Sequence, residues 1–287
     1  MNRIKRKFLN LKKRTFRYIS KNTGGSQCFC NICGNRFRFF MPYTDDRKEL
    51  RQRINKIAET GIIASPQDAF YCPYCNSTSR DRHFTAMFDK IHFSQKYLNE
   101  QIKVLHFAPE VGISKLFLDA KCDYHPVDID PKRYKHFSNI SKADITDIPF
   151  ADNTFDMIVC IHVLEHIEND GKALSELYRV LKPGGTALLQ TPYSDKLQQT
   201  FTDPSVKTRE EQIKAYVEEG HVRIYGLDLM QRYQEAGFEL HFVNSKTLFT
   251  PKDADELGFN NKEDLMIVAK PALTTTTSNK HLSTTVH

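Results

Sequence analysis

The chain has 287 residues, of which 40% are hydrophobic and 26% charged, and its formal net charge is +6. Residues 1–21 hold nine basic and no acidic residues, which leaves 32 basic and 35 acidic residues in the remainder. The body is therefore close to neutral, which excludes a large nucleic-acid-binding face, and no apolar run reaches the ~18 residues that a membrane span requires.

The basic segment, residues 1–21, has apolar residues at helical spacing, among them Ile4, Phe8 and Leu11. It is not followed by the apolar stretch of a secretory signal. A basic amphipathic helix is typical of membrane-surface anchors and of nucleic-acid-binding arms, and a solvated extension docked by a few residues shows the same pattern. The near-neutral body favours peripheral membrane contact, at the inner face of the membrane, over nucleic acid.

Residues 22–95 contain five of the seven cysteines, and four of these form two C-x-x-C pairs. The pairs Cys30–Cys33 and Cys72–Cys75 would supply the four thiolates of a structural Zn²⁺ site, and unrelated buried thiols are the alternative. Cys28 leaves one ligand position open. A helix is expected over residues 46–59 between the pairs. Free cysteines indicate a reducing compartment, so we expect a cytoplasmic protein.

Residues 96–270 alternate apolar runs with helical patterns, which predicts a doubly wound α/β fold with a seven-stranded, mostly parallel sheet. Strands are expected at 103–107, 124–129, 139–144, 155–163, 186–190, 238–243 and 265–269, and helices at 112–120, 170–181 and 226–236. The segment 192–225 exceeds the usual ~2–6-residue connection and is expected to shape a substrate pocket. The Thr-rich residues 271–287 are expected to be disordered.

The turn after the first of these strands is where a nucleotide cofactor would bind, at the carboxyl ends of the strands. It lacks the G-x-G-x-x-G pattern, since Gly112 is its only glycine. Asp128 ends the second strand near the offset at which a carboxylate accepts ribose hydroxyls, and a helix-capping role is the alternative. Asp144 ends the third strand, where it could accept the adenine amine or simply stabilise a turn.

Four segments in this order resemble the class I S-adenosylmethionine-dependent methyltransferases, in particular the type 11-like group of small-molecule and glycan enzymes. They are VDIDP (127–131), ADITDIPF (143–150), NTFDMIVCIHVLEHI (153–167) and ALSELYRVLKPGGTALL (173–189). The resemblance covers residues 103–270 and implies S-adenosyl-L-methionine as cofactor. It implies cofactor contacts at His106, Ala108, Glu110, Gly112, Asp128, Asp144, Ile145 and His162. The first loop departs from the family, which usually has an acid at His106 and glycines at Ala108 and Glu110.

Catalysis of methyl transfer depends on in-line positioning and, for an oxygen or nitrogen acceptor, on a base that titrates near pH 7. His166 is the best candidate, with Glu165 orienting it and His162 nearby, while loop structure or capping is the alternative. The resemblance also raises, weakly, a second metal at these residues and His221. Candidate substrate contacts at the end of the long connection are His221, Arg223 and Tyr225. Arg223 could bind a phosphate or carboxylate, or form a surface ion pair.

The sequence therefore predicts an enzyme, an S-adenosylmethionine-dependent methyltransferase with a small zinc-ribbon-like N-terminal domain. Its acceptor is expected to be an oxygen, or less readily a nitrogen, of a glycan or small polar molecule, with the zinc domain forming one wall of the acceptor site. A second hypothesis is an RNA methyltransferase that grips RNA through residues 1–21, Arg36, Arg38, Arg80 and Arg82, with Phe37, Phe39 or Tyr74 stacking on bases. A third is a non-catalytic zinc-ribbon binding protein on a methyltransferase-like scaffold.

Overall fold

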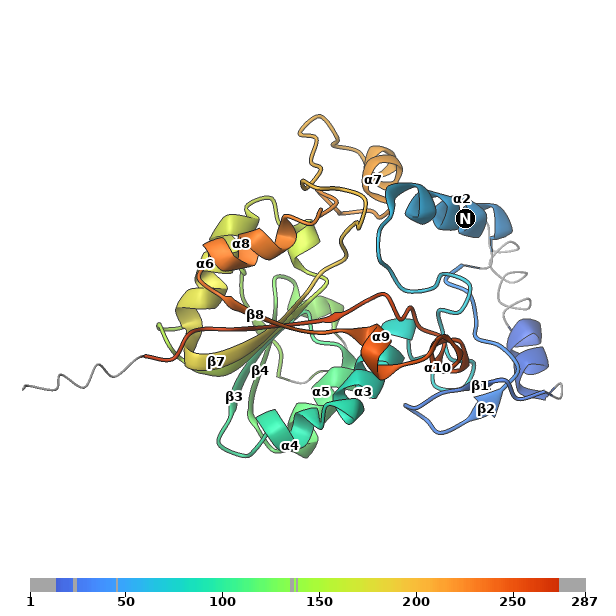
Figure 1. The fold of residues 1–287 in the computed structure, drawn as a ribbon, viewed down its shortest axis with the longest axis horizontal. Helices are drawn as coiled ribbons and strands as arrows, with labels where there is room; N and C mark the ends of the chain where they lie inside the picture. The colour runs from blue at the N-terminus through green and yellow to red at the C-terminus, as the bar shows by residue number, and fades with distance from the viewer. Residues whose placement is uncertain (1–13, 23–24, 45, 135–136, 138, 274–287) are drawn as a thin grey trace, which may run out of the picture.

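A seven-stranded sheet forms the centre of the fold (Figure 1) in a computed structural model that describes residues 14–22, 25–44, 46–134, 137 and 139–273. The strand order is β5-β4-β3-β6-β7-β9-β8, and only β9 runs antiparallel to its neighbours. This confirms the predicted doubly wound, mostly parallel α/β fold. The strands are β3 (Lys103–Phe107), β4 (Asp123–Asp128), β5 (Ser141–Lys142), β6 (Phe155–Ile161), β7 (Leu181–Gln190), β8 (Glu239–Val243) and β9 (Leu265–Ala269).

Two strands, β5 and β7, differ from their predicted extents by more than two residues. β5 has two residues in place of the expected six, because only Ser141 and Lys142 pair with β4. β7 begins at Leu181, which pairs with Phe155, and a register shift then aligns Thr186 with Met157. The Pro-Gly-Gly stretch expected to separate helix from strand thus lies inside β7, where an irregular strand tolerates a proline and a left-handed glycine.

Helices cover both faces of the sheet (Figure 1). One face carries α6 (Asp170–Val180) and α8 (Leu229–Glu235), and α6 buries residues at helical spacing. The other face carries α3 (Ser79–Lys90), α4 (Phe93–Tyr97), α5 (Val111–Asp119), α9 (Ser245–Leu248) and α10 (Pro251–Leu257). Short 3₁₀ turns occur at η1 (Pro131–Arg133) and η2 (Leu164–His166).

The helices α3 and α4 belong by packing to this larger body. Phe84 and Met87 of α3 and Phe93 of α4 lie in one buried cluster with Val104 and Met157 of the sheet. The domain boundary predicted at residue 95 therefore passes through a continuous core. Burial of large apolar side chains against the sheet, rather than closeness in sequence to the cysteines, decides where these helices pack.

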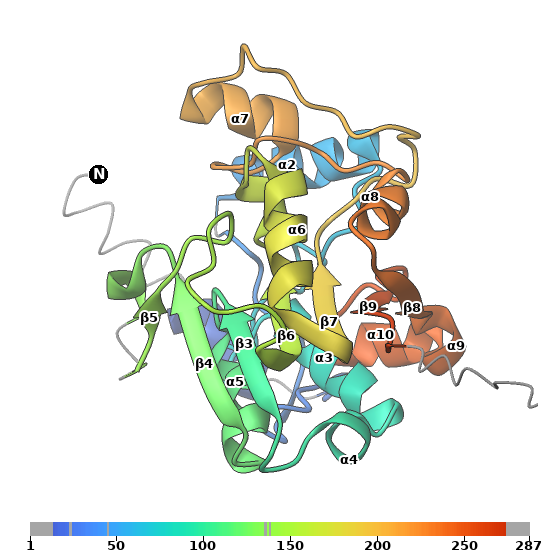
Figure 2. The same ribbon diagram turned by 90° about the vertical axis from the view of Figure 1, so that its left-hand side faces the viewer.

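The cysteine-containing region forms a hairpin and a helix. Strands β1 (Cys28–Phe29) and β2 (Arg36–Phe37) pair antiparallel. Helix α2 (Arg47–Thr60) begins at the Asp46 cap and ends at the left-handed Gly61, which confirms the helix expected between the two cysteine pairs. Helix α7 (Arg209–Tyr216) lies in the long connection after β7. Figure 2 shows α2 and α7 together beyond the carboxyl ends of the strands.

The described part of the basic segment, residues 14–21, lies in a helix that includes residue 22 and contacts the cysteine-containing region. Ser20 is fully buried and donates a hydrogen bond to the Phe39 carbonyl, and the Phe16 and Phe39 rings are 4.8 Å apart. Residues 1–13 and 274–287, on which the predictions of an amphipathic arm and a disordered tail largely rest, lie outside the described residues. In the described ranges no helix is long and apolar enough to cross a membrane.

Candidate active site and four-cysteine cluster

The four paired cysteines converge on one point. The sulfurs of Cys30, Cys33, Cys72 and Cys75 all lie within 4.8 Å of one another. The Cys30–Cys75 and Cys33–Cys72 sulfur distances are 3.7 and 3.8 Å. A tetrahedral zinc with Zn–S bonds of about 2.3 Å requires sulfurs about 3.8 Å apart, so the donor set and spacing fit this ion.

Local backbone geometry supports the cluster. Gly34 and Asn76, each following the second cysteine of a pair, have φ values of 72° and 64°. These left-handed turns suit glycine and asparagine. The Tyr74 amide donates to the Cys72 sulfur at 3.4 Å. The Cys28 sulfur lies outside the cluster, at 3.6 Å from the Arg38 carbonyl oxygen, which removes it as an alternative ligand.

Arg82 is a fully buried cation beside this cluster. Its guanidinium lies 3.9 Å from the centre of the Phe40 ring, and no ion pair of Arg82 with a carboxylate occurs among the described residues. Where the cluster holds a metal ion, the charge of Arg82 would interact favourably with the cysteine thiolates beside it. The guanidinium donates only to carbonyl oxygens, those of Ala69, Phe70, Ser77, Leu257 and Gly258.

Two residues proposed for RNA contact are therefore inaccessible. Arg82 is 0% and Phe37 2% exposed. Neither can bind a phosphate or stack on a base without unfolding the region. This part of the RNA hypothesis was wrong, because the sequence could not distinguish a buried arginine from an exposed one.

The predicted cofactor site lies where the strand order reverses, between β3 and β6. At these adjacent strand ends, Ala108 and His162 have φ values of 48° and 53°. Left-handed backbone at residues other than glycine is strained and is concentrated at functional sites. Ala108 thus takes the conformation that a glycine would adopt more easily. Gly112 has ordinary space around it, since an added Cβ would come no closer than 3.6 Å to Asp81.

Three of the predicted cofactor-binding side chains lie at these strand ends. His106 is buried, and its ring nitrogens lie 2.9 Å from the Tyr124 hydroxyl and 3.0 Å from a Glu110 carboxylate oxygen. Asp128 is 6% exposed and accepts hydrogen bonds from the Asp130 amide and the Tyr134 hydroxyl. These contacts fix the orientation of the Asp128 carboxylate at the end of β4 and leave acceptor capacity on its two oxygens.

The two candidate cofactor contacts after the third strand, Asp144 and Ile145, lie in different surroundings. Asp144 is exposed, and one of its oxygens accepts hydrogen bonds from the Thr146 amide and hydroxyl. These bonds lower the pKa of Asp144. Asp144 therefore stabilises a turn, which is the alternative role considered for it from the sequence. Ile145 is buried in the core cluster that contains Val127 and Leu164.

His162 lies between two buried carboxylates. Its Nδ1 is 3.1 Å from Glu165, and its Nε2 is 3.9 Å from Glu263. Burial and the charge of Arg80 lower the pKa of His162, but the two carboxylates outweigh them and raise it. The pKa of Glu165, despite burial, is lowered to about 2 by His162. His162 is thus held as a hydrogen-bond donor and is poorly suited to act as a free base.

Glu263 was not anticipated from the sequence. It is buried, and its second oxygen is 3.8 Å from His83, whose other ring nitrogen is 3.0 Å from the Ser245 hydroxyl. His83, His162 and Glu263 come from α3, the end of β6 and the turn before β9. No local spacing could have linked residues that lie so far apart in the chain.

A pocket of about 260 Å³ opens above these strand ends. We call it the α2–α7 pocket, because one wall comes from α2 and the loop after it and the other from the end of α7. Its lining residues are Tyr43, Arg53, Ile57, Ile62, Ala64, Ser65, Gln67, Phe70, Arg80, His162, Pro192, Tyr216, Val217, Glu218, His221, Arg223 and Ile224. The cysteine-containing region thus does contribute one wall.

His221 lines the pocket, whereas His166 is not among the residues that line it. Burial lowers the pKa of His221 to about 4, so its ring is unprotonated at neutral pH. The two rings are 4.7 Å apart, and His166 Nδ1 is 3.0 Å from the Gly220 carbonyl oxygen. The structure therefore favours His221 over His166 as the group facing an acceptor.

The fold also brings together the residues considered from the sequence as ligands of a second metal ion. Glu165, His166 and His221 each place a potential ligand atom within 4.8 Å of the others. However, both Glu165 oxygens already accept hydrogen bonds, one from His162 and one from Thr191. A carboxylate engaged in this way stabilises the local structure, and we assign no metal there.

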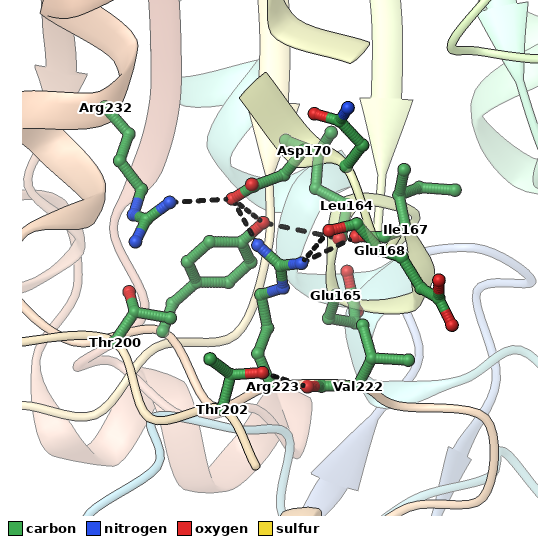
Figure 3. Close-up of polar contacts among 12 residues, drawn as sticks. Leu164, Glu165, Ile167, Glu168, Asp170, Thr200, Thr202, Val222, Arg223 and Arg232 are labelled. Carbon is green, nitrogen blue, oxygen red and sulfur yellow. Dashed lines mark hydrogen bonds and ion pairs between the residues drawn. The ribbon is translucent and has the colours of Figure 1, made fainter. Parts of the chain in front are cut away.

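Arg223 and Tyr225 both contact Asp170, and Figure 3 shows the Arg223 contacts. Arg223 forms an ion pair with the buried Asp170 and donates to the carbonyls of Ile167 and Glu168. The Tyr225 hydroxyl is 3.0 Å from Asp170, and the ring is 1% exposed. Asp170 contacts both side chains, and their predicted roles as substrate contacts stay predictions.

Part of this chain is similar to known methyltransferases. Residues 111–189 match the model of a methyltransferase domain. The chain is 30% identical over 152 residues to an uncharacterised protein of Methanocaldococcus jannaschii, an alignment covering 47% of this chain and 67% of that protein. It is 41% identical over 66 residues to the ubiquinone/menaquinone biosynthesis C-methyltransferase of Haemophilus ducreyi, covering 22% of this chain and 26% of that enzyme.

Among solved structures, an S-adenosylmethionine dependent methyltransferase from Mesorhizobium loti has a TM-score of 0.45 at 13% identity, over 64% of this chain and 98% of that one. The domain match falls on β4, β6, α6 and β7, the elements that carry the sequence resemblance. The sheet around them has β9 inserted antiparallel between β7 and β8. This chain therefore contains a class I S-adenosylmethionine-dependent methyltransferase domain, matched over residues 111–189.

Proposed function

We propose that the protein transfers a methyl group from S-adenosylmethionine to an oxygen, or less readily a nitrogen, of a small polar acceptor or glycan unit bound in the α2–α7 pocket. The observation that supports this most is the position of the pocket, which reaches His162 at the end of β6, beside the strand ends of the cofactor site. Its volume of about 260 Å³ is below the ~300–1,000 Å³ of drug-sized ligand sites, which suits a small acceptor.

The residues at the strand ends fit the proposed cofactor. Asp128 retains acceptor capacity for the ribose hydroxyls, Glu110 is a carboxylate near the expected methionyl ammonium, and the Ala108 turn permits close backbone approach. When bound, S-adenosylmethionine supplies an electrophilic methyl group on a sulfonium. The protein's own contribution is then to orient the acceptor in line and to take its proton.

His221 is the proposed base. During methyl transfer to an acceptor hydroxyl, the unprotonated imidazole of His221 would take up the hydroxyl proton. Glu165 lies within 4.8 Å of a His221 ring nitrogen and would stabilise the imidazolium that results. His162, fixed between Glu165 and Glu263, would keep the shape of the pocket beside the acceptor rather than accept the proton.

Substitution Asp128→Asn is expected to weaken S-adenosylmethionine binding about 10-fold or more, because a carboxylate accepts hydroxyl hydrogen bonds more strongly than an amide does. Isothermal titration of the purified chain measures this directly. Asp130→Asn, two residues further along at an exposed position, is the matched control and should change affinity less than about 3-fold. No cofactor binding by the wild-type chain would contradict the proposed function itself.

We also propose that the four-cysteine cluster holds a structural Zn²⁺. The purified chain is then expected to contain about one zinc ion, measured by atomic emission. Cys72→Ser should remove the ion and lower the unfolding temperature of the chain, since metal binding contributes directly to folding. Cys28→Ser should keep the zinc, because the Cys28 sulfur lies outside the cluster. Equal zinc loss in both variants would contradict the assigned ligands.

The RNA hypothesis loses support from the burial of Arg82 and Phe37. The likeness to a quinone-pathway C-methyltransferase covers about a quarter of that enzyme, so it supports the cofactor domain and says little about the acceptor. An assay of methyl incorporation from labelled cofactor into small-molecule, glycan, lipid and RNA fractions separates these possibilities. We expect label in the small-molecule or glycan fraction, and label in RNA alone would overturn this assignment.

A further inference from the structure

Arg80 places a positive charge at the α2–α7 pocket. It is the second residue of α3 and lines the pocket. Its Nε is buried without a hydrogen-bond partner, and within the described ranges no ion pair of Arg80 occurs. Arg80 is partly buried, and its Nε is withdrawn from water without a partner, which is costly, so the site favours an anionic ligand that reaches this nitrogen.

The other charged groups that line the pocket are already compensated. Arg53 pairs with Glu218 and also donates to Gln67 and to the Val217 carbonyl. Arg223 is neutralised by Asp170 behind the pocket wall. The lining arginines therefore leave one excess positive charge, that of Arg80.

The two buried carboxylates nearest to His162, those of Glu165 and Glu263, do not form an ion pair with Arg80. Glu165 accepts hydrogen bonds from His162 and Thr191, and Glu263 is contacted by His162, His83 and Gln190. Each lies outside ion-pair distance of Arg80, so both are satisfied without it.

We propose that the acceptor is a small amphipathic acid, whose carboxylate binds Arg80 while its apolar part packs on the pocket walls. This rests on the proposed methyl transfer and names the substrate class for it. The planar guanidinium matches a carboxylate in a two-oxygen geometry. The walls supply apolar contact through Tyr43, Ile57, Ile62, Phe70, Tyr216 and Ile224. An acid held by Arg80 would present a second polar group toward His162 and His221.

A carboxylate could reach Arg80 from a second source, the methionyl group of the cofactor. Arg80 lies in the first turn of α3, and the neighbouring Asp81 side chain is the closest one to Gly112 of the cofactor loop. The chemistry is the same in both cases. The test must therefore measure the cofactor and the acid separately.

The test uses the full-length chain with zinc retained and compares benzoate with benzamide, which have the same shape and differ in charge. Binding is measured by titration calorimetry after saturation with S-adenosylhomocysteine. In the wild-type chain benzoate should bind at least about 10-fold more tightly than benzamide. Arg80→Gln should abolish this preference, and Arg80→Lys, which keeps the charge without the planar fork, should retain part of it.

The matched control is Arg47→Gln, which removes an exposed arginine of α2 and should leave the benzoate preference unchanged. S-adenosylhomocysteine affinity, measured first, should be the same in wild type and Arg80→Gln. A large loss of that affinity would assign Arg80 to the cofactor and overturn the proposal. Equal binding of benzoate and benzamide, or no benzoate binding below about 10 mM, would also overturn it while leaving the methyltransferase assignment intact. Failure of S-adenosylhomocysteine to bind the wild type would instead refute the proposed function.

Discussion

Substitution Arg82→Met is expected to lower the free energy of unfolding by about 3–5 kcal/mol. The guanidinium is 0% exposed and donates to five backbone carbonyls from three segments of the chain. Methionine fills a similar volume but leaves those carbonyls unsatisfied and leaves the thiolate cluster without its nearby cation. Urea unfolding followed by circular dichroism, with zinc present, measures the loss.

The control for this change is Arg36→Met. Arg36 pairs with Glu256 at 3.0 Å, but its side chain is 55% exposed, so the same substitution there should cost less than about 1 kcal/mol. Arg82→Met should also weaken zinc binding, whereas Arg36→Met should not. If both variants unfold at the same urea concentration as the wild type, the buried guanidinium does not hold the cysteine-containing region to α10.

Substitution Glu165→Gln is expected to cost about 3 kcal/mol of folding free energy at pH 7, because the pKa of this buried carboxyl is about 2 in the folded chain against 4.5 when unfolded. A depressed carboxyl pKa contributes stability that is fully present above about pH 4.5 and is lost as the pH falls toward 2. The difference between wild type and variant should therefore shrink to about half near pH 3. Unfolding free energies measured from pH 7 down to pH 3 test this.

The matched control is Glu168→Gln, an exposed neighbour for which the difference should stay within about 0.5 kcal/mol at every pH. A second readout is the pKa of His162, measured by imidazole proton shifts. It should fall in Glu165→Gln, since one of the two carboxylates that raise it is gone. A stability difference that does not vary with pH would show that Glu165 acts through shape rather than charge.

The order of elements and the family were accessible from the sequence because they depend on local signals. Continuous apolar runs marked β3 and β6, and spaced apolar residues marked α6. The spacing of two cysteine pairs indicated the sulfur cluster, since C-x-x-C turns form locally and only their meeting requires the fold. The same local reasoning failed at β7, where pairing with β6 extended a strand through a Pro-Gly-Gly stretch.

Which side chains lie in the candidate site, and which are buried elsewhere, depended on the tertiary structure. From the sequence, Arg82 and Arg223 were expected to be accessible cations. In the fold both are buried, and each donates to a carbonyl more than 50 residues away in the chain. The His83–Glu263–His162 set and the Arg80 pocket combine segments from four parts of the chain. The sequence by itself determined the alternation of strands and helices and the four thiolates, because each follows from neighbours within a few residues, and its resemblance to a family implied the cofactor. Only the tertiary structure decided which charges are paired, because burial and partner choice are set by contacts between distant segments.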